Sequence, residues 1–438
     1  MRFGYADARS QPFDAFVGDT TGLRHAPETI PGRPLGWPPV SPVDTQPTSA
    51  TESVPSALLT FGTVVLIAGG VLGALWMLHP IARKWDLEDL AVYRAAGNAV
   101  VNGHSVYGSH VADQLRVPLP FIYPPFAALL ATPFTWLGET PANLAWTAVT
   151  VVLLAAVVSI CFAPLVHRFG RAGPVALVLA LLAVAALSPV EDHLRFGQVG
   201  IPLMACCVFD CMVERPRWPR GALIGIATAV KLVPAIFIPY LWLSGRRRAA
   251  GVAAATFGAC TLVGFVVVPG DSWDFFRSKI FQPTSPKYFT NQSLEGILQR
   301  AISGPWRGFW IIAVVVVIVY GLKAAVAANR GGDELRAVAI IGLVSVLVSP
   351  ISWIHHLVWV IPAIAVIVGT GRDRRRVAIG FLVAASFVAR LPYFGHDEVK
   401  TGFLATLLQD SYGLICIALL VYLARGLRTP AVEGASMR

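Results

Sequence analysis

Long apolar stretches constrain the fold of this chain more than any other feature of its sequence. Many approach the ~17 to 25 residues that an α-helix needs to cross a bilayer. Of the 438 residues, 55% are hydrophobic and only 14% are charged, and the mean hydropathy is +0.64. A soluble core cannot bury so much apolar surface. We therefore predict an all-α polytopic membrane protein.

Basic clusters between the apolar stretches indicate the topology, because cytoplasmic loops are enriched in Lys and Arg. A single crossing by 221–243 would separate RPRWPR (215–220) from GRRR (245–248), so we predict a re-entrant hairpin that turns at Lys231-Leu-Val-Pro234. Similar reasoning makes 121–137 an interfacial or re-entrant segment on the outer face. If both cross fully, the chain has twelve spans. Otherwise ten remain: 57–78, 143–165, 174–188, 198–213, 249–268, 307–328, 335–349, 354–370, 376–391 and 403–425.

This topology places both termini in the cytoplasm. Residues 1–55 are rich in Pro, Ser, Thr, Asp and Gly, which predicts a disordered tail, and 429–438 form a second short tail. The membrane domain then spans 56–428, and its first apolar run is expected to act as an uncleaved signal anchor. The distinctive outer loops are 79–120, 189–197, 269–306 and 349–356, with a less distinctive one at 392–402.

Charge and cysteine usage exclude several functions. The net charge of +10 comes from short loop clusters rather than from a continuous basic face, which argues against nucleic-acid binding. The six cysteines lie in or beside apolar stretches and are interpreted as small core residues, so we predict no disulfide, metal or cofactor.

The densest acidic cluster, Asp86, Glu88 and Asp89, directly follows the first apolar run. One interpretation is helix capping by Asp86 and Asp89, which contributes about 1 kcal/mol. Carboxylates at the mouth of a helical bundle are costly to desolvate, however, so the alternative is a functional site on the outer face.

Other polar residues stand in apolar surroundings. Lys231 interrupts an apolar arm, and its burial calls for an anionic partner or a lipid phosphate. His355 and His356 lie at an outer span end, where adjacent positions on a helix do not form a two-ligand metal face by themselves. Aromatic and amide groups of the kind that bind sugars occur at Tyr123, Gln198, Asn291 and Gln292.

Together and in this order, six motifs resemble the GT-C glycosyltransferases of glycosyltransferase family 87, the polyprenyl-phosphate-mannose-dependent mannosyltransferases of mycobacteria and their relatives. The motifs are Asp89-Leu-Ala-Val-Tyr93 with Asn102-Gly-His-Ser-Val-Tyr107, Phe121-Ile-Tyr-Pro-Pro125, Gly197-Gln198, Lys231-Leu-Val-Pro234, Asn291-Gln-Ser-Leu294 and Ser349-Pro-Ile-Ser-Trp353 before His355-His356. The resemblance covers about residues 86 to 356. At Ile354 this chain departs from relatives that have an acid.

The resemblance implies a GT-C fold with an outer-face site, a polyprenyl-phosphate-mannose donor, and a phosphatidylinositol mannoside acceptor that receives an α-1,2-linked mannose with inversion. Asp89 corresponds to the catalytic carboxylate, the general base, and Asp86 or Glu88 assists it or caps the helix. Candidates to neutralise the phosphate are Lys231, Arg195, His355 and His356, and those for sugar stacking are Tyr107, Tyr123 and Trp353, with Tyr93, Gln198, Asn291 and Gln292 as further substrate-binding residues.

Three alternatives stay open. The enzyme uses another polyprenyl-linked sugar, it branches lipomannan or lipoarabinomannan, or the chain is a lipid-sugar flippase or transporter. The last is disfavoured because one broken apolar segment has no counterpart in the other half of the chain. The oligomeric state is not indicated.

Overall fold

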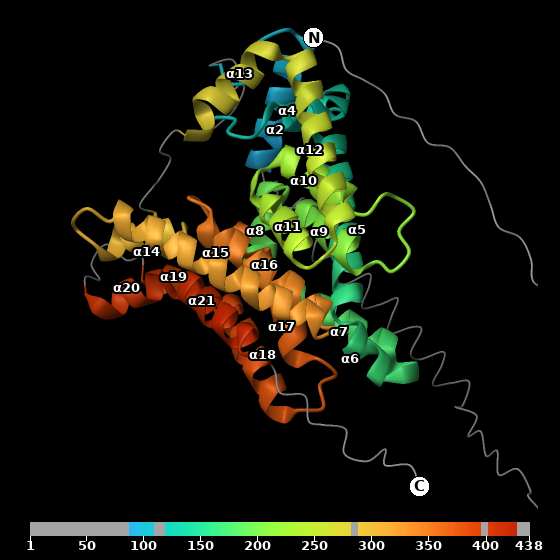
Figure 1. The fold of residues 1–438 in the computed structure, drawn as a ribbon, viewed down its shortest axis with the longest axis vertical. Helices are drawn as coiled ribbons and strands as arrows, with labels where there is room; N and C mark the ends of the chain where they lie inside the picture. The colour runs from blue at the N-terminus through green and yellow to red at the C-terminus, as the bar shows by residue number, and fades with distance from the viewer. Residues whose placement is uncertain (1–86, 109–118, 282–287, 396–401, 427–438) are drawn as a thin grey trace, which may run out of the picture. The chain divides into compact units, whose positions relative to one another are not determined.

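The computed structural model describes residues 87–108, 119–281, 288–395 and 402–426 (Figure 1). Over these ranges the regular structure is helical, apart from one isolated antiparallel bridge between Asn291 and Trp353. The prediction of an all-α membrane protein is confirmed. The predicted tails 1–55 and 429–438, the predicted span 57–78, and Asp86 lie outside the described residues.

The helices of the described ranges are α2 (Glu88–Val101), α4 (Pro125–Ala131), η1 (Thr132–Trp136), α5 (Glu139–Cys161), α6 (Ala163–Arg168), η2 (Gly170–Ala172), α7 (Gly173–Ala185), α8 (Ser188–Phe196), α9 (Gly200–Met212), α10 (Ala222–Val230), η3 (Val233–Ile236), α11 (Phe237–Leu243), α12 (Arg247–Val267), α13 (Pro269–Arg277), η4 (Lys279–Phe281), α14 (Leu294–Ala301), α15 (Arg307–Arg330), α16 (Glu334–Val348), η5 (Ile354–Trp359), α17 (Val360–Val368), α18 (Arg374–Val388), α19 (Leu391–Phe394), α20 (Phe403–Gln409) and α21 (Ser411–Ala424). The η segments are 3₁₀ helices.

Three helices in the described ranges are long and apolar enough to cross a membrane by themselves, namely α5, α12 and α15. Two further pairs qualify if each counts as one bent span: α7 with α8, bent by 71°, and α20 with α21, bent by 67°. Other predicted spans differ in how well their lengths match: 198–213 forms the shorter α9, with 13 residues, whereas α16, with 15 residues, is as long as the predicted span 335–349. Local breaks explain part of the difference, since Pro189 lies in the first turn of α8 and Leu357 interrupts η5 with non-helical dihedrals.

The segment 221–243 has the two arms and the turn that the sequence predicted. A Cβ on Gly221 would lie 2.1 Å from the Ala249 carbonyl oxygen, so the first arm, α10, begins beside the first turn of α12. The second arm, α11, ends next to the same turn, because the Arg246 amide donates to the Leu241 carbonyl. The first arm therefore begins, and the second arm ends, at the same end of α12 (Figure 1). The turn between the arms carries Lys231.

The segment 121–137 forms only the short helices α4 and η1, which pack against α2. The approach is close, because a Cβ on Gly97 would lie 3.0 Å from the carbonyl carbon of Ala131. Their length is too small for a membrane crossing, which fits the predicted partial insertion.

The most continuously buried helix of the core is α16, which is buried along most of its length against α15, α17 and α21.

The hairpin predicts that both basic clusters face the same side of the membrane. In variants R217C and R248C, both exposed positions should react with a membrane-impermeant maleimide from the cytoplasmic side, in inverted vesicles but not in intact cells. Variant D274C, on α13 beyond the opposite end of α12, serves as the outer control and should show the reverse. Labelling of 217 and 248 from opposite sides would exclude the hairpin.

Candidate functional site

Asp89 lies in the first turn of α2, and its carboxyl group is largely removed from solvent. The helix begins at Glu88 after Leu87, whose side chain provides no cap, and Asp86, the cap that the sequence suggested, lies outside the described residues. Burial raises the pKa of Asp89 to about 6, although a hydrogen bond from Gln198 and the positive charge of Lys231 both lower it. A carboxyl group with this pKa exchanges a proton readily near neutral pH.

The turn between α8 and α9 covers Asp89. Gly197 has a φ of 69°, and a Cβ there would lie 2.9 Å from the Leu90 Cβ, so the backbone passes very close to α2. This contact brings the buried Gln198 side chain to Asp89. The Gln198 Oε1 atom also accepts a hydrogen bond of 3.1 Å from the Tyr93 hydroxyl. Gln198 thus connects the acid to an aromatic pair.

That pair is formed by Tyr93 and Tyr123. The Tyr93 hydroxyl lies 3.1 Å from the Tyr123 hydroxyl, and the ring centroids are 5.3 Å apart in an edge-to-face arrangement. The Lys231 Nζ atom lies 5.2 Å from the Tyr123 ring centroid, which is a cation–π distance. The structure therefore brings together five of the predicted residues, from four separate segments of the chain, around one acid and one amine.

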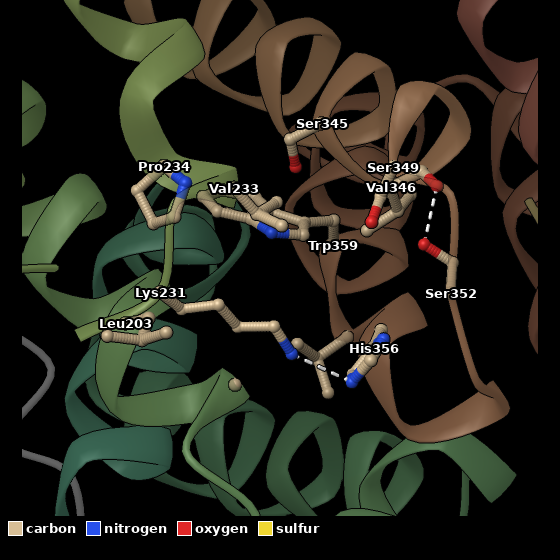
Figure 2. Close-up of a pocket in the computed structure, with 12 residues that line it drawn as sticks. Leu203, Lys231, Val233, Pro234, Ser345, Val346, Ser349, Ser352, His356 and Trp359 are labelled. Carbon is tan, nitrogen blue, oxygen red and sulfur yellow. Dashed lines mark hydrogen bonds between the residues drawn. The ribbon is translucent and has the colours of Figure 1, made fainter. Parts of the chain in front are cut away.

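A pocket extends from Lys231 between the hairpin, α16 and η5 (Figure 2). Its cavity volume is about 40 Å³ and it opens to the outside, and its lining is mostly apolar, with Ser345, Ser349 and Ser352 on one side. The Lys231 Nζ atom lies 2.9 Å from His356 Nε2, and His356 Nδ1 lies 3.2 Å from the Trp353 backbone nitrogen, which donates to it. A cation in such a pocket suits an anion that carries a hydrocarbon chain.

His193 was missed in the sequence, although it stands one turn before Gly197. It is fully buried on α8, and its Nε2 atom accepts a hydrogen bond of 2.7 Å from the Ile201 amide at the start of α9. This bond fixes the turn that carries Gln198. His355, in contact with Phe196 of α8 at 5.5 Å between centroids, holds η5 against the same helix.

Asn291 and Gln292 are fully buried and use their amides within the protein. Asn291 Oδ1 accepts from the Ser352 amide at 2.9 Å, and Nδ2 donates to the Pro350 carbonyl at 3.2 Å. Gln292 Nε2 donates to the Gln409 carbonyl at 2.6 Å, and Oε1 accepts from the Gly413 amide at 2.8 Å. This geometry favours a positioning role for both amides over direct contact with a substrate.

Tyr107 lies at the outer edge of the aromatic pair, and its hydroxyl donates to the Tyr123 carbonyl at 2.7 Å. Its segment is fixed by Asp271 of α13, which accepts from the Ser105 hydroxyl at 2.5 Å and the Val106 amide at 2.9 Å. Asp271 was also missed, because its position after a predicted span has no distinctive sequence signal.

Arg195 is exposed on α8, with its guanidinium 5.3 Å from the Phe196 ring centroid, and shows no direct contact with Asp89 in the described residues. Trp353 is half-buried next to His356. Within the described ranges, no group of three or more His, Cys, Asp and Glu residues has the arrangement of a metal site.

Comparison with known proteins gives consistent matches. The family model described as glycosyltransferase family 87 matches residues 121–350. A polyprenol-phosphate-mannose-dependent alpha-(1-2)-phosphatidylinositol mannoside mannosyltransferase of Mycobacterium tuberculosis strain H37Rv is 35% identical over 346 residues, covering 72% of this chain and 80% of that protein. The protein of the same name in Mycolicibacterium smegmatis is 33% identical, covering 73% and 78%.

A further relative in Mycobacterium tuberculosis strain CDC 1551, named as acting on phosphatidylinositol pentamannoside, is 31% identical and covers 73% of this chain and 75% of its own length. Among solved structures, ArnT from Cupriavidus metallidurans bound to undecaprenyl phosphate is similar with a TM-score of 0.43 and 16% identity, covering 85% of this chain and 73% of that one.

The close packing of Gly197 on α2 predicts a large effect of one added methyl group. Gly197→Ala should lower the apparent melting temperature in detergent, because it combines strain at positive φ, about 1 to 2 kcal/mol, with a clash costing about 1 to 3 kcal/mol. Gly245→Ala is the matched control, since Gly245 also has positive φ, 88°, but open space where its Cβ would lie. Equal losses for the two variants would mean that the contact with α2 adds nothing.

Proposed function

The chain belongs to glycosyltransferase family 87, and we propose that it transfers mannose from polyprenyl-phosphate-mannose to a phosphatidylinositol mannoside, forming an α-1,2 linkage with inversion. The proposal puts the reaction on the outer face of the plasma membrane with Asp89 as the general base. The observation that carries it is the partly desolvated Asp89 carboxyl group, held by Gln198 within the field of Lys231.

In this reaction the acceptor hydroxyl attacks the anomeric carbon of the donor mannose from the face opposite the phosphate. Asp89 takes the hydroxyl proton as the new C–O bond forms. The bond from the anomeric carbon to the phosphate oxygen breaks, and its electron pair leaves with the polyprenyl phosphate. A base whose pKa lies near neutrality is well suited to this step, because it is ionised at working pH yet still basic enough to accept a proton.

The pocket beside Lys231 supports the donor part of the proposal. Lys231 and His356 present two nitrogen atoms 2.9 Å apart at the end of a mostly apolar pocket. We propose that the two groups stabilise the negative charge that develops on the phosphate as it leaves. The isoprenoid chain would then extend along the apolar lining formed by residues such as Leu203, Val233 and Val346.

The relatives carry two different acceptor names, one with phosphatidylinositol mannoside and one with the pentamannoside, and both are named for α-(1-2) transfer. The identity to the first group is higher, at 35% against 31%. We therefore propose the phosphatidylinositol mannoside series as the acceptor class, and the length of the acceptor glycan is the variable to test.

Asp89→Asn is the direct test of the base. It keeps the side-chain shape but cannot accept the proton, so transfer of radiolabelled mannose from polyprenyl-phosphate-mannose should fall by about 10²- to 10⁴-fold. Asp274→Asn, an exposed carboxylate on α13, is the matched control and should keep full activity. Equal expression and equal size-exclusion profiles confirm that the proteins are intact. Undiminished transfer by Asp89→Asn would remove the general-base role.

The raised pKa of Asp89 predicts the pH dependence of the reaction. The base works only when ionised, so kcat/KM should rise with pH through about 6 and level off above it. The hydrogen bond from Gln198 lowers this pKa, so Gln198→Leu should move the rising limb to higher pH. The readout is the pH profile of kcat/KM at saturating donor. A limb that stays in place in Gln198→Leu would show that another group controls the profile.

A further inference from the structure

Two aromatic pairs follow on from the segment that carries His356, and we call their four side chains the aromatic row: Trp353 with Tyr288, and Phe289 with Tyr393. The Trp353 and Tyr288 ring centroids are 6.3 Å apart, and those of Phe289 and Tyr393 are 5.2 Å apart. Tyr288 and Phe289 are adjacent in the chain. Two members present much of their surface, since Tyr288 is 67% and Tyr393 is 40% exposed.

The far end of the row carries charged groups from α8 and from the turn before α19. The Tyr393 hydroxyl donates to Asp192 Oδ2 over a long 3.4 Å, and Asp192 is almost fully buried. The Arg390 Cζ atom lies 5.8 Å from the Tyr393 ring centroid, and Arg390 pairs with Glu191 at 2.5 Å. Arg390 has a φ of 56°, and a non-glycine residue in this region is strained, as is common at binding sites.

The backbone beneath the row is fixed by buried polar contacts. The Arg300 side chain donates to the Tyr288 carbonyl at 2.7 Å and forms an ion pair with Asp410 at 2.6 Å, and both side chains are nearly buried. Asn291 and Trp353 form an isolated antiparallel β-bridge, and the Gln292 side-chain amide donates a hydrogen bond to the Phe289 carbonyl. A surface ordered in advance binds with a smaller entropic cost. The two buried amides that the sequence indicated as substrate-binding thus support the row from below.

The chemistry of the row matches a glycan. Sugars present apolar C–H faces that pack on aromatic rings, and hydroxyl groups that bond to carboxylates and guanidinium groups. The row offers Tyr and Trp rings, which combine an apolar face with a polar atom, and the partly exposed Arg390 guanidinium lies beside its Tyr393 end. An acyl chain would gain nothing from the partly exposed Glu191 and Arg390, so a lipid tail fits this surface less well.

We propose that the aromatic row binds the mannose residues of the acceptor that are not attacked. The inference rests on the proposed function and adds a specificity site to it. Trp353 begins the row and contacts His356, which contacts Lys231, so an acceptor that reaches Asp89 with its terminal sugar can lay its other sugars along the row. The row then sets the preference for acceptor length.

The test compares acceptors that carry increasing numbers of mannose residues. Tyr393→Ala and Tyr288→Ala should raise KM for the longer acceptors about 3- to 10-fold, the loss expected for one aromatic contact, with kcat and the KM of the shortest acceptor unchanged. Tyr393→Phe keeps the ring and should stay near wild type. Tyr320→Ala is the matched control, because Tyr320 on α15 is also 40% exposed and lies outside the row.

The outcomes separate the two proposals. Unchanged KM values, or an equal rise for every acceptor length, would refute sugar binding by the aromatic row. Mannosyl transfer by the wild type would in that case still support the proposed function. If the wild type transfers no mannose, sugar binding by the aromatic row is tested separately. The purified protein is titrated with soluble manno-oligosaccharides, and binding is followed by tryptophan fluorescence. Binding that Tyr393→Ala weakens and Tyr320→Ala does not supports it, and absent or equally weakened binding refutes it.

Discussion

The structure of the site depends on the contact between the α8–α9 turn and the start of α2. Gly197 allows the backbone to approach Leu90, and this approach both removes water from Asp89 and supplies Gln198 as its partner. Desolvation alone would protonate the acid, and the charge of Lys231 alone would weaken it as a base. The balance between these effects gives Asp89 a pKa near neutrality. A bulkier residue at 197 would disturb both the burial of Asp89 and its hydrogen bond with Gln198.

The two partners of Asp89, and the histidine that contacts Lys231, come from breaks in regular helix. Gln198 follows a left-handed glycine, Lys231 lies in the extended turn of the hairpin, and His356 belongs to a 3₁₀ segment before α17. Helix breaks free backbone groups that must find partners, which is costly inside a membrane. Here buried side chains supply some of them, as His193 does for Ile201 and Asn291 does for Ser352. The irregular backbone and the polar site therefore support each other.

Sequence reasoning identified the helical class and the broken hairpin because hydropathy and loop charge report directly on membrane crossing. It also indicated Lys231, since a charged group in an apolar stretch needs a reason to be there, whereas Asp89, Gln198 and His356 were assigned mainly through the family resemblance. It did not give the lengths of helices such as α9, which depend on tertiary packing. His193 and Asp271 were missed because their importance lies in backbone contacts across the fold. The buried state of Asn291 and Gln292 depends on the same kind of contact.

The contact between Lys231 and His356 links charge in the pocket to the backbone that begins the aromatic row. A neutral imidazole has one donor and one acceptor nitrogen. If His356 Nδ1 accepts from the Trp353 amide, Nε2 carries the hydrogen and the Lys231 amine must accept it. If Lys231 instead donates as an ammonium, Nδ1 carries the hydrogen and the Trp353 bond is lost. A phosphate oxygen beside both groups accepts from the ammonium and from Nε2–H at once, so it allows a charged Lys231 and an intact Trp353 bond together. A phosphate bound at this position would in this way stabilise the turn that carries Trp353.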